Sequence, residues 1–163
     1  MGRGRYPAAI VLWLAALAAM PAIAGDSPTK VAQQLQQAAA SYAKGDIESA
    51  WFGFWVLAQK GDPLAQFNLA QLYRLGQGIP VDLQRARYWY AEAAARGNGP
   101  AQFNLGLMYE HGYGTPVDRT DARAWYRRAA AQNIAEAVEG LQRLEGQARL
   151  PGPRRRDENG TPP

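Results

Sequence analysis

The chain has 163 residues, of which 47% are apolar and 20% are charged, so its length and composition are those of one compact globular domain. Its formal net charge of +4 is concentrated at the two ends, and the nearly neutral centre excludes the basic stripe expected of a nucleic-acid-binding protein. The chain has no cysteine, which excludes thiol catalysis, thiolate metal sites, disulfides and the acylated cysteine of a lipoprotein.

The first 24 residues have the order of a secretory signal peptide. Arg3 and Arg5 form a positive start, residues 8–20 form an uncharged apolar run, and an Ala-Ile-Ala sequence ends at Ala24. The alternative is a transmembrane anchor, but the run of 13 residues is shorter than the roughly 20 that span a bilayer. We therefore expect cleavage after Ala24, and a periplasmic or secreted protein without a transmembrane segment.

A linker is expected at residues 25–29, and a repeat domain at residues 30–147. Its first two helices are expected at residues 30–43 and 46–60, joined by a short turn. The second of these segments carries small and aromatic residues in a pattern that returns 36 residues later in the chain.

The middle of the chain is an internal repeat. Residues 65–98 and 101–134 align without a gap at an offset of 36 residues and are identical at 18 of 34 positions. Each unit predicts two helices. The first has apolar residues at helical spacing and stops at a Gly-x-Gly sequence; the aspartate of a Pro-Val-Asp sequence then N-caps the second.

The repeat pattern continues once more in the C-terminal part of the chain. Residues 134–147 predict an unpaired first helix whose charged residues suit an end cap with one face in water. Residues 148–163 are rich in proline, glycine and arginine, and this composition predicts a disordered tail. We interpret the tail as solubilising; the other interpretation is weak attraction to an acidic partner.

These residues carry a resemblance to a known family. The segment AQFNLGLMYEHGYGTPVD, followed by ARAWYRRAA, resembles the Sel1-like repeat, a relative of the tetratricopeptide repeat. The resemblance implies an all-α fold, a short right-handed α-solenoid of antiparallel helix pairs. About seven helices are expected: one tetratricopeptide-like hairpin, two Sel1-like repeats and one C-terminal capping helix.

Small and aromatic residues recur at the repeat period. Alanines at positions 50, 86 and 122 should let the helices approach closely. The pairs Trp89-Tyr90 and Trp125-Tyr126 could form a ligand-stacking surface, but their recurrence favours packing between helices. Residues 51–57 hold too many aromatic side chains for one face, so an exposed aromatic patch is expected there.

No catalytic constellation is visible in the sequence. His111, the sole histidine, could act as a general base, but its position favours an interaction with a helix C-terminus. We therefore expect no enzyme, no cofactor and no metal. The alternatives left open are a hydrolase of the kind described for cysteine-rich relatives that bind or hydrolyse β-lactams, and a periplasmic chaperone for one cognate protein.

The resemblance implies that the first helices line a concave face on which a protein partner lies, for example an envelope or inner-membrane protein. We expect a monomeric adaptor, scaffold or regulator that binds no nucleic acid. The expected partner-binding residues are Phe67, Gln71, Arg74, Phe103, Leu107 and Glu110. The alternative is that the two phenylalanines belong to the core and that the other four residues are solvated surface. Exchanging the charges of Arg74 and Glu110 is expected to weaken partner binding without affecting folding.

Overall fold

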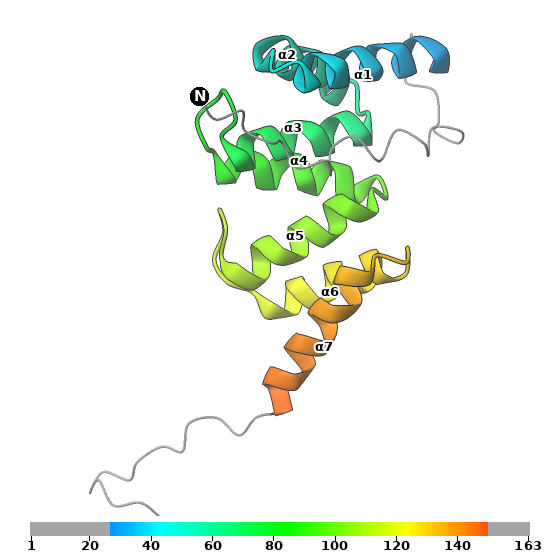
Figure 1. Cartoon of the computed structure of the whole chain (residues 1–163). Coiled ribbons are helices and arrows are strands. Elements are labelled where there is room, and N and C mark those ends of the chain that lie inside the picture. The colour runs from blue at the N-terminus through cyan, green and yellow to red at the C-terminus, as the bar shows by residue number, and fades with distance from the viewer. Residues whose placement is uncertain (1–26, 150–163) are drawn as a thin grey trace, which may run out of the picture.

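The computed structural model describes residues 27–149, which form seven α-helices and, within that range, no strand (Figure 1). The helices are α1 (Pro28–Ala43), α2 (Ile47–Gln59), α3 (Pro63–Leu75), α4 (Leu83–Ala95), α5 (Gly99–His111), α6 (Arg119–Ala130) and α7 (Ala135–Arg149). The expected all-α fold with about seven helices is confirmed.

The helix ends follow from side-chain chemistry. Six helices begin after a side chain that accepts a hydrogen bond from a free backbone N–H of the first turn; these N-caps are Ser27, Asp46, Asp62, Asp82, Asn98 and Asp118. Helices α3 and α5 end at Gly76 and Gly112, whose φ angles of 66° and 76° lie in the left-handed region that favours glycine. The Asp caps and Gly stops predicted for the repeats are therefore confirmed.

The helices stack as antiparallel pairs. Helices α1 and α2, α3 and α4, and α5 and α6 pack as hairpins, and each second helix also packs on the first helix of the next hairpin (Figure 1). One side-chain bond recurs at the junctions between hairpins: the Nε2 of Gln66 donates to the carbonyl oxygen of Ala58, and that of Gln102 to the carbonyl oxygen of Ala94, both at 3.1 Å. The solenoid architecture is thus built from repeated local contacts.

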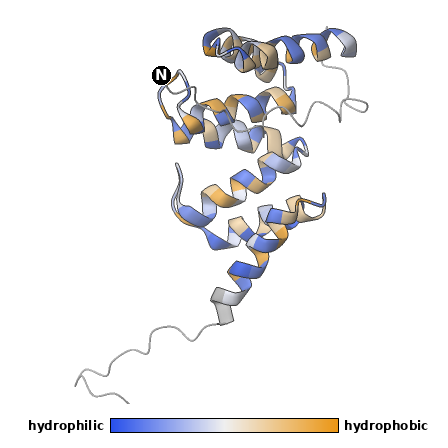
Figure 2. Ribbon diagram, viewed as in Figure 1, coloured by the Kyte–Doolittle hydropathy of each residue, from blue (hydrophilic) through white to orange (hydrophobic). Residues whose placement is uncertain are grey.

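The core occupies the inner faces of this stack. Ala50, Ala86 and Ala122 are completely buried, as expected for residues that allow helices to approach closely. Figure 2 shows apolar and polar residues intermixed along the helices. On α7 the exposed side includes Glu136, Glu139, Gln142 and Glu145, which agrees with an end cap.

The element boundaries differ slightly from the sequence expectation. Helix α1 begins at Pro28 because Ser27 caps it, so its start lies inside the expected linker. Helix α7 extends to Arg149, two residues into the expected tail. The predicted signal peptide and the remainder of the tail lie outside the described residues. Between residues 27 and 149, no helix is long and apolar enough to cross a membrane.

Candidate protein-interaction surface

The six predicted partner residues lie on two equivalent helices, three on α3 and three on α5. We call these six residues the stripe. In the first repeat, the stripe residues gather around Tyr90 of α4. The ring of Phe67 lies 5.9 Å from the ring of Tyr90, whose hydroxyl donates a hydrogen bond of 2.6 Å to Oε1 of Gln71. The Nε of Arg74 donates to the hydroxyl of Tyr90 at 3.2 Å.

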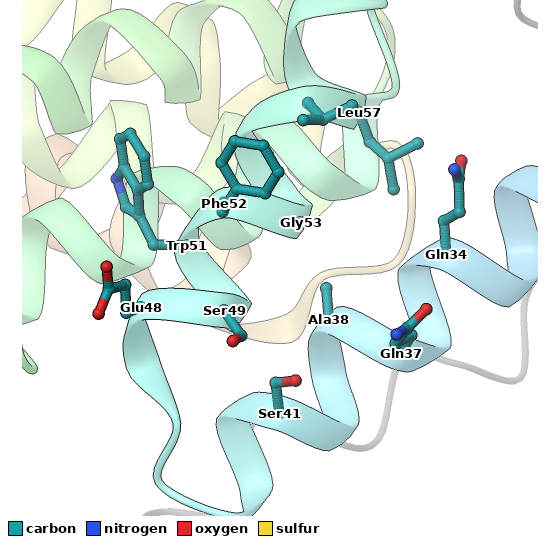
Figure 3. A pocket seen from close by; sticks show the side chains of 11 residues that line it. Gln34, Gln37, Ala38, Ser41, Glu48, Ser49, Trp51, Phe52, Gly53 and Leu57 are labelled. Atoms are coloured by element: carbon teal, nitrogen blue, oxygen red, sulfur yellow. The ribbon is translucent and has the colours of Figure 1, made fainter.

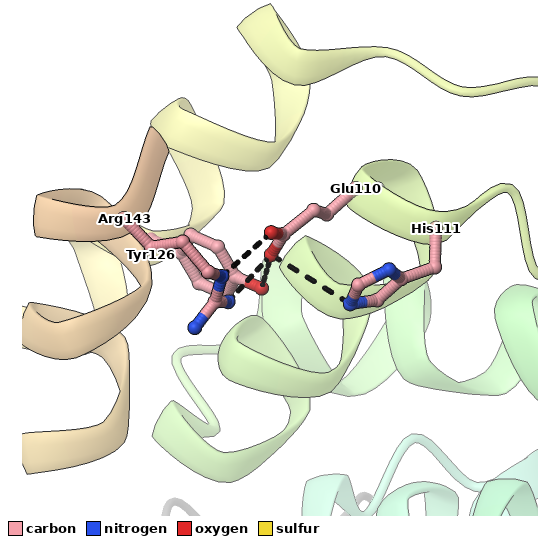
Figure 4. Close-up of polar contacts among 4 residues, drawn as sticks. All are labelled: Glu110, His111, Tyr126 and Arg143. Atoms are coloured by element: carbon pink, nitrogen blue, oxygen red, sulfur yellow. Dashed lines mark hydrogen bonds and ion pairs between the residues drawn. The ribbon is translucent and has the colours of Figure 1, made fainter. Parts of the chain in front are cut away.

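In the second repeat, the equivalent residues gather around Tyr126 of α6. Phe103 lies 5.7 Å from the Tyr126 ring, and the Tyr126 hydroxyl donates to Oε2 of Glu110 at 2.6 Å. The guanidinium of Arg143 then reaches from α7 and donates to both oxygens of Glu110, at 2.9 and 2.8 Å (Figure 4). In each repeat, therefore, the stripe residues contact a tyrosine. Only in the second repeat does a residue of α7, Arg143, bind a stripe residue.

Burial divides the stripe into two groups. Phe67 and Glu110 are buried, with exposed fractions of 6% and 8%. The other four stripe residues are half-buried and keep some surface; they are Gln71, Arg74, Phe103 and Leu107. The expectation that Glu110 could be reversed in charge without affecting folding is therefore wrong, because an arginine there would face Arg143 from a buried position.

The titratable groups of this network hold fixed protonation states. The hydrogen bonds from Arg143 hold the pKa of Glu110 below its usual range. Burial raises the pKa of Tyr90 to about 12, and burial together with the bond to Glu110 raises that of Tyr126. At neutral pH, both tyrosine hydroxyls therefore keep their proton and donate a hydrogen bond, and the ionised carboxylate of Glu110 accepts hydrogen bonds from Tyr126 and Arg143. These bonds join α3 to α4, α5 to α6 and α5 to α7.

His111 lies at the last turn of α5, as the sequence indicated. Its Nε2 is 3.9 Å from Oε2 of Glu110, longer than a hydrogen bond, and its side chain is 44% exposed (Figure 4). The ring also lies 5.4 Å from that of Tyr113. Within residues 27–149, no group of three or more histidine, cysteine, aspartate or glutamate residues could hold a metal ion.

The recurring aromatic pairs belong to the packing between helices. Trp89 is 8% exposed, and Tyr90 and Tyr126 are fully buried. Trp125 is half-buried, and the guanidinium of Arg128 lies 4.4 Å from its ring. The packing interpretation of these pairs is thus correct.

Helix α2 carries the exposed aromatic patch that the sequence predicted. Phe52 is 59% exposed and Trp55 is 36% exposed. Their rings lie 6.3 Å apart, and Trp55 also stacks on Trp51 at 6.0 Å. A cluster of exposed aromatic side chains is a feature of binding surfaces.

A groove between α1 and α2 lies beside this patch and has a volume of about 540 Å³ (Figure 3). We call it the α1–α2 groove. Its lining includes Gln34 and Ser41 of α1, and Glu48, Trp51, Phe52 and Val56 of α2. The sequence indicated the aromatic residues but not the polar ones, because polar residues on an amphipathic helix carry no signal that they share a hollow.

Arg143 is a second residue that sequence reasoning missed. The sequence placed it on the solvent-facing side of the last helix, whereas it binds Glu110, 33 residues earlier. The repeat did not predict this pair, because the residues 36 positions earlier are Arg74 and Leu107, which cannot form an ion pair.

Comparisons with known proteins agree with this geometry. A family profile described as "Sel1 repeat" matches residues 63–98 and 99–134. No curated protein matches the chain. Among solved structures, a Sel1 repeat protein from Oxalobacter formigenes is 35% identical, with 69% of this chain and 88% of that one covered and a TM-score of 0.64.

Two further solved structures share the fold. The protective antigen c5321 of uropathogenic Escherichia coli, which displays an SLR fold, is 29% identical with a TM-score of 0.69. The match covers 78% of this chain but only 27% of that antigen. Cysteine-rich protein B of Helicobacter pylori is 13% identical with a TM-score of 0.55, covering 71% of this chain and 97% of its own, and supports the fold alone.

Proposed function

Because the chain belongs to the Sel1-repeat family, whose members are generally non-catalytic protein-interaction scaffolds, we propose that it binds a partner protein as an adaptor, scaffold or regulator. The observation that carries this proposal is the pair of matched repeat units, which present equivalent but non-identical side chains. The titratable network around Tyr126 supports it, since its groups are engaged in holding helices together.

The stripe is the surface we assign to the partner. Its half-buried members offer apolar contacts in the second repeat, through Phe103 and Leu107, and polar contacts in the first, through Gln71 and Arg74. Core positions of the two repeats are either identical or both apolar or small, as Leu72 and Met108 are, whereas the polar Gln71 is replaced by the apolar Leu107 at the equivalent position. A partner that contacts both repeats would therefore meet a polar end and an apolar end.

We place this activity in the bacterial periplasm or cell envelope. Support comes from the first 24 residues, which have the charge, length and small-residue pattern of a cleaved signal peptide. An envelope or inner-membrane protein is accordingly the partner we expect.

Chemical crosslinking in intact cells followed by mass spectrometry tests the proposal. The chain is compared with a double variant, Arg74→Ala with Leu107→Ala, which shortens the stripe at two half-buried positions. The matched control is Arg85→Ala with Val138→Ala, which removes the same types of side chain at exposed positions outside the stripe.

A protein crosslinked by the wild type and the control, but recovered at least tenfold less with the stripe variant, supports the proposal. Equal recovery with all three chains would remove the stripe as the binding surface. The absence of any reproducible protein partner would contradict an interaction module altogether.

A further inference from the structure

The α1–α2 groove lies at the N-terminal end of the helix stack (Figures 1 and 3). Helix α2 packs on α3, α4 packs on α5, and α6 packs on α7. Within residues 27–149, α3, α5 and α7 each pack on the helix before them, and α1 has no helix before it. Within these residues, α1 therefore lacks the neighbouring second helix that α3, α5 and α7 each have.

The groove opens beside a position where the two repeats carry a large side chain. Gly53 lies 36 residues before Trp89 and 72 before Trp125. A Cβ at Gly53 would lie only 2.8 Å from the Cβ of Ala38, so α1 and α2 are in contact there and form the floor of the groove. Gly53 therefore lets α1 and α2 approach closely, and the groove opens beside this contact between the two helices.

The rim of the groove is apolar on the side of α2. Phe52 is the most exposed aromatic of this helix, with a 59% exposed fraction, and Val56 lies one turn further along. The opposite end of the solenoid differs, because α7 turns carboxylates and amides to water. A terminal helix pair needs a polar outer face for solubility, so this apolar rim at the N-terminal end indicates a surface that is covered in use.

The polar groups of the groove define the charge of its occupant. Its eleven lining residues include one charged residue, Glu48, and no lysine, arginine or histidine. Within the described residues 27–149, Oε1 of Gln34 is buried and accepts no hydrogen bond. An occupant that supplies hydrogen-bond donors and a positive charge complements these groups.

We propose that the α1–α2 groove is a second docking site, which binds a helical segment of a partner protein. The segment has an apolar face that covers Gly53 and Phe52, and a basic residue that pairs with Glu48. A helix is the occupant because Glu48, Phe52 and Val56 follow one another at intervals of four residues along one side of α2. An amphipathic helix that lies along this side can match an apolar face and a basic residue to them. This site shares no residue with the stripe, so the proposal for the groove can be tested independently of the function proposed above.

Two synthetic amphipathic helical peptides test the site. Both have 18 residues and the same leucine and alanine face; one carries lysine and the other glutamate on its polar face. Fluorescence anisotropy of each dye-labelled peptide is measured with the full chain, and with variants Phe52→Ala and Glu48→Gln. Tyr113→Ala is the matched control, since Tyr113 is another exposed aromatic, far from the groove lining.

The lysine peptide is expected to bind at least tenfold more tightly than the glutamate peptide. Phe52→Ala should weaken the binding of the lysine peptide about tenfold, as for an aromatic contact that the peptide covers. Glu48→Gln should weaken it up to about fivefold, as for an exposed ion pair, and Tyr113→Ala should leave it unchanged.

Equal binding of the two peptides, or an unchanged affinity of Phe52→Ala, would overturn the proposal. A neutral oligosaccharide such as maltoheptaose is titrated in parallel, since aromatic rings beside amides also suit sugars. Binding of the sugar that Phe52→Ala abolishes, without binding of the lysine peptide, would reassign the groove to carbohydrate. The stripe variant should bind the lysine peptide normally, which separates the two sites.

Discussion

The guanidinium of Arg143 in α7 binds both carboxylate oxygens of Glu110 in α5, at 2.9 and 2.8 Å, across 33 residues of sequence. The carboxylate is 8% exposed and also accepts the hydroxyl of Tyr126. The pair joins the last helix to the second repeat at a point where the first repeat has no equivalent. It thus fixes the capping helix to the stack through polar contacts as well as apolar ones.

Replacing Arg143 with methionine is expected to destabilise the protein by about 1–2 kcal/mol, because a buried carboxylate loses two hydrogen bonds while the half-exposed arginine loses little. The free energy of unfolding from urea titration measures the effect. In the double variant with Glu110→Gln, the two losses should be less than additive. Strict additivity would show that the two residues do not interact.

The contribution of Glu110 should depend on pH. Its pKa is lowered in the folded protein, so its ionised form stabilises the fold above the ordinary glutamate pKa of about 4.3. This stabilisation is lost as the pH falls through the lower, folded-state pKa. The difference in unfolding free energy between wild type and Glu110→Gln should therefore be constant from pH 6 to 7 and shrink below about pH 4. A difference that grows on acidification would contradict this assignment.

Two glycines hold the ring of Tyr126 between α5 and α7. A Cβ on Gly106 would lie 2.6 Å from this ring, and one on Gly140 would lie 2.8 Å from it. Each alanine substitution should lower stability by ~1–3 kcal/mol through overpacking. Gly146→Ala is the control in the same helix as Gly140, since its Cβ meets nothing within 4 Å, and it should leave the melting temperature equal or higher.

Ala86 is completely buried in α4, so Ala86→Leu should cost ~1–3 kcal/mol. The exposed Ala124 of α6 provides the control, and Ala124→Leu should change the free energy of unfolding by less than about 0.5 kcal/mol. Thermal and urea unfolding of both variants measure this. Equal melting temperatures for the two would argue against close packing at Ala86.

The signal-peptide proposal predicts the N-terminus of the exported protein. Protein isolated from the cell envelope should begin at Gly25, and Edman sequencing or mass spectrometry of the intact chain measures this directly. Replacing Ala22 and Ala24 with bulky leucines should block cleavage, because the cleavage site requires small residues. An envelope protein that retains Met1 would count against a cleaved leader.

The repeat helices could be predicted well from the sequence because their signals are local. The apolar spacing, the aspartate caps and the glycine stops each act within a few helix turns or one loop. The 36-residue offset is visible when the two units are aligned. The partner surface was harder to predict. Phe67 and Glu110 were assigned to it from their position on a helix, yet both are buried, because helix periodicity says which residues share a side and not what covers that side.

The sequence by itself determined the repeat, its helices and their caps, since short-range hydrogen bonding and periodic burial fix these features. Only the tertiary structure decided that Arg143 of α7 binds Glu110, and that α1 and α2 enclose a groove beside their contact at Gly53. Both depend on how whole helices meet. A contact between helices depends on their separation and crossing, which many residues set together, and no single spacing along the chain records it.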